Sequence, residues 1–245
     1  MEKSSEARMK KNLSEETHWE RAAKTRIGKY LTRMETDFIF KSINPSQIYT
    51  IMDVGAEAGR FSLLNSNSEA TVIGIDIESY GLKRLKRKAK DINVIQADAR
   101  KMPIKEGVFD AIFMIEVLDY IAELGEALTE SHRTLKSNAA LFLSFGNKSS
   151  LKSKLRDLRG KSYRHPYNRV MQCLSKIGFV VVRKMGYNWL LFGRTSENRL
   201  IPFSAGIEKL FGLRRIPSLS PWVMLHAVKC NKSLSDNRWP ILGKP

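Results

Sequence analysis

Four acidic residues, each placed at the end of a short apolar run, carry the strongest chemical signal in the sequence. They are Asp53, Asp76, Asp98 and Glu116. The apolar runs before them have the composition of buried parallel strands. Because the carboxyl ends of parallel strands face one crevice at a switch point of the sheet, we expect the four carboxylates to line a single site.

A turn that contains glycines follows the first acid. Gly55 and Gly59 separate the run that begins at Ile48 from a segment that can start a helix. Such a turn places backbone N–H groups and a helix N-terminus beside a ligand. Glu57 occupies the position at which a dinucleotide-binding turn approaches a pyrophosphate, and its carboxylate would repel phosphate. The turn therefore favours a cofactor that has no phosphate and carries a positive end.

The second acid adds a nucleoside signal. Asp76 ends the run that begins at Ala70, and Glu78 follows it. An acid roughly 20 residues beyond a glycine turn can hold the two hydroxyls of a ribose. By itself this spacing fits NAD as well as other adenosine ligands.

Four motifs together resemble one family. In chain order they are Asp53-Val-Gly55 with Gly59, Gly74-Ile-Asp76, Gln96-Ala-Asp-Ala99 and Phe109-Asp-Ala-Ile112. The chain resembles the class I S-adenosylmethionine (SAM)-dependent methyltransferases from about Ile48 to Gly146, and more loosely in its C-terminal third. The resemblance implies SAM as the cofactor. With the strands expected along the chain, it implies an α/β fold: a Rossmann-like, seven-stranded, mostly parallel sheet with helices on both faces.

The resemblance also implies which residues bind SAM. The turn would line the methionine end, Asp76 would take the ribose hydroxyls, and Asp98 would face the adenine amino group. Glu116 would lie at the pocket edge near the transferred methyl group. Where the family has its middle glycine this chain has Glu57, which would widen the turn or bond the SAM ammonium group or an arginine. The expected cofactor-binding set is Asp53, Gly55, Ala56, Glu57, Gly59, Asp76, Ile77, Asp98, Ala99 and Glu116.

The remaining elements follow from periodicity. We expect a helix from about Ser14 to Lys41, broken near Gly28, in which Trp19 and Tyr30 serve mainly for packing. Further helices are expected over residues 80–91, 124–135 and 167–179, and strands over 139–145, 179–183 and 222–228. The predicted organisation is an N-terminal helical lid (1–44), a SAM-binding core (45–147), a part that completes the sheet with two basic insertions on the acceptor side (148–230), and a loose tail (231–245).

Charge is divided unevenly along the 245 residues. Residues 1–147 hold 22 Lys/Arg and 21 Asp/Glu, a balance of +1, whereas residues 148–245 hold 20 and 4, a balance of +16. The two parts sum to the net charge of +17. A field of that size attracts anionic partners, so the second half indicates what the acceptor side binds.

Several classes of protein are disfavoured. No run approaches the roughly 18 apolar residues of a membrane helix. The charged N-terminus lacks an apolar signal core, and we predict a cytoplasmic location. Cys173 and Cys230 do not have metal-ligand spacing, so we expect reduced cysteines and no metal site.

Two insertions indicate the acceptor. Residues 147–166 are basic, and residues 186–221 mix apolar and basic side chains, a pattern that suits an anionic lipid surface or a long amphipathic substrate. An ordinary basic surface explains the pattern about equally well. The segment Met114-Ile-Glu-Val117 lacks the N-P-P-Y or D-P-P-Y motif of relatives that methylate amino nitrogens, and neither cysteine follows a pocket strand.

The leading hypothesis is therefore O-methylation of a small or lipid-linked anionic molecule, such as a glycan or its precursor, with peripheral membrane contact as an option. An RNA methyltransferase that binds phosphates through the basic half is the first alternative. A non-catalytic, SAM-binding protein of this kind is the second. His165 is the candidate general base, with Tyr163, Tyr120 and Glu116 behind it. The oligomeric state is left open.

Overall fold

The computed structural model describes residues 15–43, 50–65, 70–156, 164–189, 192–193 and 195–230. Its strands are β1 (Thr50–Val54), β2 (Thr71–Asp76), β3 (Asn93–Gln96), β4 (Phe109–Ile115), β5 (Leu135–Gly146), β6 (Phe179–Tyr187) and β7 (Trp222–Lys229). Its α-helices are α2 (His18–Lys24), α3 (Arg26–Phe40), α4 (Ser79–Lys88), α5 (Leu124–Thr134), α6 (Leu151–Arg156), α7 (Tyr167–Ile177) and α8 (Ile201–Leu210). Short 3-10 helices are η2 (Ser62–Asn65), η3 (Leu118–Tyr120) and η5 (Leu213–Arg215).

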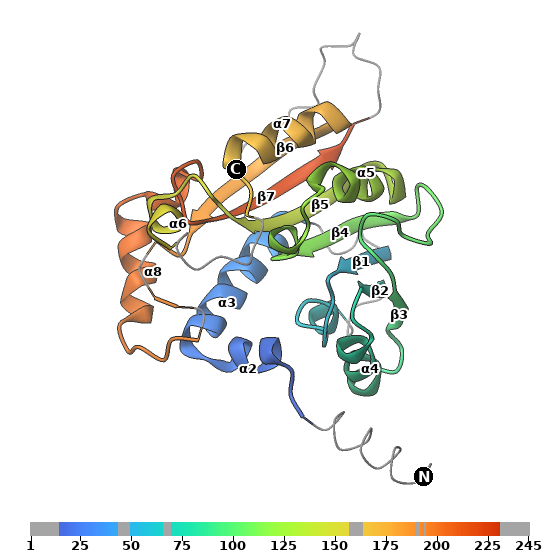
Figure 1. Ribbon diagram of the computed structural model, residues 1–245, viewed down its shortest axis with the longest axis horizontal. Coiled ribbons are helices and arrows are strands. Elements are labelled where there is room, and N and C mark those ends of the chain that lie inside the picture. Colours follow the sequence, from blue (N-terminus) through green and yellow to red (C-terminus); the bar gives the residue numbers. More distant parts are fainter. Residues whose placement is uncertain are drawn as a thin grey trace.

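The described strands form one seven-stranded sheet in the order β3-β2-β1-β4-β5-β7-β6 (Figure 1). The pairs from β3 through β5 are parallel, and β7 runs antiparallel to both β5 and β6. The strand order reverses between β1 and β4, which is the switch point at which α/β sheets bind ligands. The predicted Rossmann-like, mostly parallel α/β fold is confirmed.

Helices cover both faces of the sheet. Side chains of α5 and α7 share one buried cluster with the strands, and side chains of α3 and α4 share the other (Figure 1). Along β5, Leu141 and Leu143 belong to the first cluster and Phe142 to the second. This alternation follows from the two-residue period of a strand, and burial on both faces explains why these strands read as unbroken apolar runs.

The N-terminal helix is divided at a different residue from the one we predicted. Thr25 has extended backbone angles (φ −65°, ψ 162°), ends α2 and caps α3 by accepting a 3.1 Å hydrogen bond from the N–H of Gly28. The helix is thus broken near Gly28, as predicted, but the break lies three residues earlier and Gly28 itself lies inside α3. A Cβ there would come within 2.0 Å of the Ala22 carbonyl oxygen, so this glycine allows α2 and α3 to meet closely.

The C-terminal half completes the sheet and supplies its far edge. β5, β7 and β6 extend beyond the strands predicted from the sequence, and the helices at 80–91, 124–135 and 167–179 form near their expected bounds. Ser14, residues 44–49 and the predicted tail at 231–245 lie outside the described residues. Within the described ranges, we find no helix that combines the length and apolarity needed to cross a membrane.

Candidate functional site

A cavity of about 1360 Å³ lies at the carboxyl ends of β1, β2 and β4. Helix α2 forms one wall, the glycine turn another and η3 a third. Every residue of the predicted cofactor-binding set lines this cavity. The structure thus brings together the strand-end acids that the sequence places far apart.

The glycine turn has a shape that requires glycine at two positions. Gly55 (φ 72°) and Gly59 (φ 90°) are left-handed, and a Cβ on either would come within 2.3 Å of Val117 or 2.4 Å of Leu85. The N–H groups of Gly55 and Ala56 donate to the Ile75 carbonyl, at 2.7 and 3.0 Å. These two N–H groups therefore tie β1 to β2, so they are not available to a ligand in the way the sequence suggested.

Glu57 closes the turn on itself. It too is left-handed (φ 47°), its N–H donates to Asp76 Oδ2 at 2.9 Å, and its carboxylate accepts from the N–H of Ala58. Gly81 lies against it, since a Cβ on Gly81 would be 2.8 Å from the Glu57 backbone. Glycine at position 81 therefore gives the turn the room that a glutamate in its middle needs.

Asp53 is buried at the tip of β1. Its Oδ2 accepts hydrogen bonds from the N–H and the hydroxyl of Ser62, at 2.9 and 2.5 Å. Burial raises the pKa of Asp53 to about 6, although the Ser62 hydrogen bonds and the charge of Arg60 oppose that rise. A carboxylate with so little water around it interacts strongly with any positive group brought into the cavity.

Asp76 is oriented by the backbone. Besides the Glu57 N–H on Oδ2, its Oδ1 accepts from the N–H of Glu78 at 2.9 Å. Ile77 lies between Asp76 and Glu78 in the sequence. Its side chain lines the cavity and is 60% exposed. A fixed carboxylate beside an open apolar side chain is an arrangement that suits a ribose and the ring attached to it.

Asp98 is already engaged by a neighbour. Arg100 binds both of its oxygens, the shortest contact being 2.7 Å, and also pairs with Glu123 at 2.7 Å. These hydrogen bonds from Arg100 hold the pKa of Asp98 below its usual value. No sequence motif indicated this pairing. The pairing leaves Asp98 at the cavity rim with fewer acceptor positions free.

A buried ionic network lies at the other end of the cavity. The Arg60 guanidinium lies 3.4 Å from Glu35 and 3.8 Å from Glu116, and the Tyr187 hydroxyl donates to Glu35 at 2.6 Å. Burial would lower the pKa of Arg60, but Glu35 and Glu116 raise it. Burial and the same two carboxylates raise the pKa of Tyr187 well above its usual value. Glu116 itself has a left-handed backbone (φ 63°) and is held by Ser144, which accepts from its N–H at 3.0 Å.

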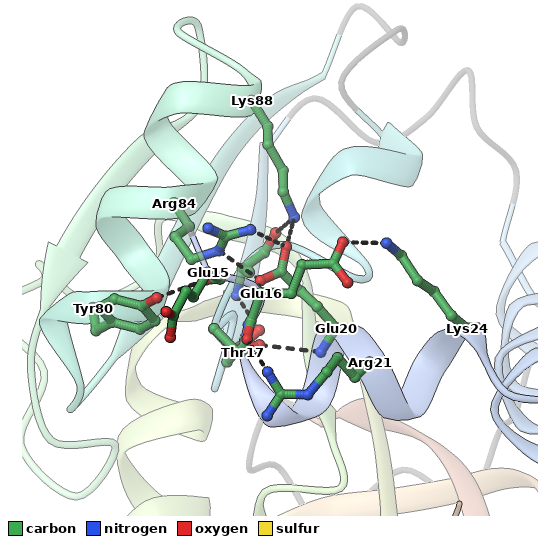
Figure 2. A network of polar contacts seen from close by, with 11 residues as sticks. Glu15, Glu16, Thr17, Glu20, Arg21, Lys24, Tyr80, Arg84 and Lys88 are labelled. Carbon is green, nitrogen blue, oxygen red and sulfur yellow. Dashed lines mark hydrogen bonds and ion pairs between the residues drawn. The ribbon is translucent and has the colours of Figure 1, made fainter. Parts of the chain in front are cut away.

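Helix α2 is fastened across the cavity to α4 (Figure 2). Glu20 of α2 pairs with Arg84 at 2.6 Å and Lys88 at 2.7 Å, and the Tyr80 hydroxyl donates to the Glu15 carbonyl at 2.7 Å. Burial would raise the pKa of Glu20, but the hydrogen bonds from Arg84 and Lys88 outweigh it and bring the pKa to about 2. These ion pairs and this hydrogen bond hold α2 against α4, and α2 thereby forms a wall of the cavity.

An aromatic contact holds the other side of α2. Trp19 makes T-shaped ring contacts with Tyr120 in η3 and with His18. The ring centroids are 6.2 Å and 5.2 Å apart, respectively. All three residues line the cavity. Trp19 therefore does more than the packing we expected, because it forms part of the cavity wall.

Comparison with known proteins agrees with this geometry. The family model of a methyltransferase domain matches residues 52–143. An uncharacterized protein of Methanocaldococcus jannaschii is 31% identical over 117 residues, which cover 48% of this chain and 49% of that protein. The malonyl-[acyl-carrier protein] O-methyltransferase of Legionella pneumophila is 29% identical over 96 residues, covering 37% and 34%. The chain thus spans about half or less of the length of these curated relatives.

Solved structures share the fold. The geranyl diphosphate C-methyltransferase of Streptomyces coelicolor, solved with S-adenosyl-L-homocysteine, superposes with a TM-score of 0.55 at 14% identity, over 74% of this chain and 73% of that one. The family match thus assigns a methyltransferase domain to residues 52–143, and the solved structures share its fold.

The charge of the cavity lining fits SAM. Nine carboxylate side chains and five cationic side chains line it. A lining with that excess of carboxylates, including the buried Asp53, attracts a sulfonium and an ammonium group and repels phosphates. The lining therefore favours SAM over a dinucleotide.

His165 does not occupy the place that we predicted for it. It is 2% exposed and lies outside the cavity lining. Its Nε2 donates to the carbonyl oxygens of Leu118 and Ile121, at 3.2 and 2.9 Å. The geometry corrects the general-base assignment: His165 holds the backbone of η3, which lines the cavity. Tyr163, the second candidate, lies outside the described residues.

Three cavity residues were missed by sequence reasoning. Arg60 follows the glycine turn directly, Arg100 follows Asp98 by two residues, and His18 begins the lid helix. Proximity to a recognised motif could have indicated the two arginines. His18 had no such signal, because its place in the cavity depends on how α2 packs.

Proposed function

We propose that the chain transfers the methyl group of SAM to an oxygen atom of a small or lipid-linked anionic molecule. The observation that carries this proposal is the gathering of Asp53, Asp76, Asp98 and Glu116 around one cavity at the strand ends. Bound SAM supplies a methyl group that is already activated by the sulfonium charge. The protein then has to hold the acceptor atom in line with that methyl group and to exclude water.

The assigned roles follow the order of residues along the cavity. Asp76, fixed by two N–H groups, is assigned to the ribose hydroxyls, with Ile77 against the adenine ring. Asp98 and Ala99 are assigned to the adenine edge. The residues assigned to the methionine end are Asp53, Gly55, Ala56, Glu57 and Gly59, with Glu116 beside the transferred methyl group.

The charge distribution supports an acceptor whose anionic part stays outside. The cavity lining has more carboxylates than cations, so a phosphate or sulfate deep within it would be repelled. The second half of the chain, with its balance of +16, offers that group an attractive surface outside the cavity. An uncharged hydroxyl inside and an anionic group at the basic surface meet both conditions.

A hydroxyl acceptor is helped by a nearby base. Two side chains of the cavity wall can serve: His18 on α2 and Tyr120 in η3, both in contact with Trp19. A base within hydrogen-bond reach of the hydroxyl removes its proton as the new bond forms. We assign this role to His18, because a ring nitrogen of imidazole can accept the proton of the hydroxyl.

Transfer of labelled methyl groups tests the proposal. The protein is incubated with SAM that carries a labelled methyl group and with extract from its own source, and the products are divided into lipid, small-molecule, RNA and protein fractions. Label in the lipid or small-molecule fraction is expected. Label that ribonuclease releases would replace the proposal with RNA methylation, and label in protein would also contradict it.

Calorimetry with unlabelled SAM makes an absence of label interpretable. If SAM binds and no fraction carries label, the alternative of a non-catalytic SAM-binding protein is supported. If SAM does not bind, the cofactor assignment itself fails.

A further inference from the structure

Helix α8 exposes a stripe of large apolar side chains, while its buried side holds two polar residues together with Ile201. Phe203, Ile207 and Leu210 follow one another at helical spacing and are 69%, 42% and 81% exposed. Ser204 and Glu208, on the opposite side, are 2% and 0% exposed. A surface helix of a protein in water has the reverse arrangement.

Polar contacts fix this orientation. The Glu208 carboxylate accepts from the Tyr30 hydroxyl at 2.5 Å and from the N–H of Trp189 at 2.9 Å, and Arg214 lies 3.7 Å from it. Burial and the Glu208 charge raise the pKa of Tyr30, so its hydroxyl stays protonated as a donor. Rotating α8 to bury its apolar stripe would leave a charged carboxylate without these partners.

The apolar surface continues beyond the helix. Leu200 before it and Phe211 after it are 59% and 69% exposed, and Leu219 is 60% exposed. We call Phe203, Ile207, Leu210 and Phe211 the α8 surface. Exposed apolar side chains gathered in this way mark a place of contact with another molecule.

The exposed charges between residues 198 and 230 are all positive, and the exposed carboxylate just before them, Glu197, lies 3.8 Å from Arg26. Arg199, Lys209 and Arg215 are exposed beside it. Glu208 is the only acidic residue between positions 198 and 230, and it is buried. The surface therefore presents large apolar side chains among positive charges, with no exposed carboxylate in that segment.

We propose that the α8 surface binds the headgroup region of an anionic phospholipid membrane. Phe and Leu side chains that insert at the lipid–water boundary, with Lys and Arg at headgroup level, are the features of peripheral membrane helices. A second copy of the chain would bring the same positive charges together across a two-fold axis, which disfavours self-association.

The α8 surface lies beside the lid of the cavity. Tyr30 of α3 contacts Glu208, the N–H of Ile27 donates to the Ser196 carbonyl at 3.2 Å, and α3 joins α2 at Thr25 (Figure 1). A membrane bound at α8 would therefore lie close to α3, which is joined to the cavity-lining helix α2. Binding to lipid does not depend on methyl transfer, so the two proposals are tested separately.

Co-sedimentation with vesicles tests the inference on the full chain. One set contains phosphatidylcholine alone, and the other contains about one-third phosphatidylglycerol. We expect binding to the second set only. The double variant Phe203→Ser/Leu210→Ser should bind at least about tenfold more weakly, and Lys209→Glu about fivefold or more.

Matched variants elsewhere separate the surface from general charge. Val182→Ser changes a side chain that is 48% exposed on β6, and Lys83→Glu reverses an exposed charge on α4. Both should bind anionic vesicles within about twofold of the wild type, since each lies outside the proposed contact. Equal losses in Lys83→Glu and Lys209→Glu, or no loss in the double variant, would overturn the proposal.

Two further measurements keep the result clear. A Phe203→Trp variant should show a blue shift in fluorescence with anionic vesicles beyond that of the wild type, and no shift would contradict insertion. Sedimentation velocity without lipid tests for a second copy: a dimer that the double variant abolishes, together with no vesicle binding, would assign the surface to self-association. Unchanged SAM affinity in the double variant would show that its fold and cofactor site remain intact.

Discussion

The guanidinium of Arg60 lies 3.4 Å from the carboxylate of Glu35, a side chain with no exposed surface. This contact joins the turn after β1 to helix α3, and the Tyr187 hydroxyl joins β6 to the same carboxylate. The glycine turn after β1, helix α3 and the edge strand β6 therefore meet at one ionic contact. Because a buried charge without a partner is very unfavourable, this contact should contribute strongly to stability.

Replacing Arg60 tests that contribution. Arg60→Met removes the cation and leaves Glu35 and Glu116 without it, so we expect the free energy of unfolding to fall by about 3 kcal/mol. Urea denaturation measures the change. Arg33→Met, an exposed arginine on the same helix as Glu35, should change it by less than about 0.5 kcal/mol. Restoration of much of the lost stability in Arg60→Met/Glu35→Gln would confirm the cause, and a double variant as unstable as Arg60→Met would contradict it.

The raised pKa of Asp53 predicts a dependence of stability on pH. Its folded pKa is about 6 and its ordinary value is 3.8, so the folded state holds a proton that the unfolded state has lost between these values. Ionised Asp53 therefore destabilises the fold as the pH rises, by at most about 3 kcal/mol above pH 6.

The variant Asp53→Asn measures this effect. Between about pH 4 and about pH 7 the wild type should lose stability relative to Asp53→Asn, which keeps an oxygen to accept from Ser62. Urea denaturation at a series of pH values measures the difference. Asp91→Asn, at an exposed position, should show no such trend. A difference that stays constant with pH would mean that burial does not raise this pKa.

The assignment of Asp76 is tested by SAM affinity. In Asp76→Ala the ribose hydroxyls lose a charged acceptor and the N–H groups of Glu57 and Glu78 lose theirs. We expect SAM to bind at least about tenfold more weakly by calorimetry. Asp91→Ala is the control outside the cavity, and its affinity should not change. Equal affinity in wild type and Asp76→Ala would remove the ribose assignment.

The ion pairs between α2 and α4 predict that removing them makes α2 more mobile. Glu20→Gln weakens the pairs with Arg84 and Lys88, so hydrogen exchange in α2 should become faster and SAM affinity should fall several-fold. Because the folded pKa of Glu20 is lowered from 4.5 to about 2, its stabilising effect is present above pH 4.5 and is lost as the pH falls toward 2. Lys83→Gln, on the exposed side of α4, should leave both properties unchanged. Faster exchange throughout the chain in Glu20→Gln would indicate general destabilisation instead.

The sequence predicts the sheet and the strand-end acids well because their signals are local. Asp53 and Asp76 each follow an apolar run directly, and the parallel fold brings such ends together. A break between two helices was predicted near Gly28, since glycine is a poor helix former. Thr25 supplies the cap, and Gly28 instead allows the two helices to approach closely. A glycine required by packing cannot be told from one that ends a helix without the neighbouring helix.

Contacts between distant residues could not be predicted. Arg60 and Glu35 belong to different elements, and neither has a motif that announces a partner. In the sequence, α8 appears only as a mixture of apolar and basic residues. Which of its sides is buried depends on the contact of Glu208 with Tyr30, and that contact cannot be predicted from sequence. His165 stood beside a proline in a basic insertion, which fits a catalytic residue and a buried structural one equally.

The structural role of His165 gives the last prediction. His165→Ala removes the donor to the carbonyls of Leu118 and Ile121, so η3 should loosen and the free energy of unfolding should fall by about 2 kcal/mol. If its role is only to position η3, the pH dependence of methyl transfer by the remaining folded protein should keep its wild-type shape, since no titrating base is lost. His18→Ala should slow methyl transfer by about 100-fold or more, because the proposed base is lost. It should change stability little, because His18 is exposed. A changed profile in His165→Ala together with an unchanged rate in His18→Ala would reinstate His165 as the base. That outcome would require η3 to open so that the imidazole reaches the cavity.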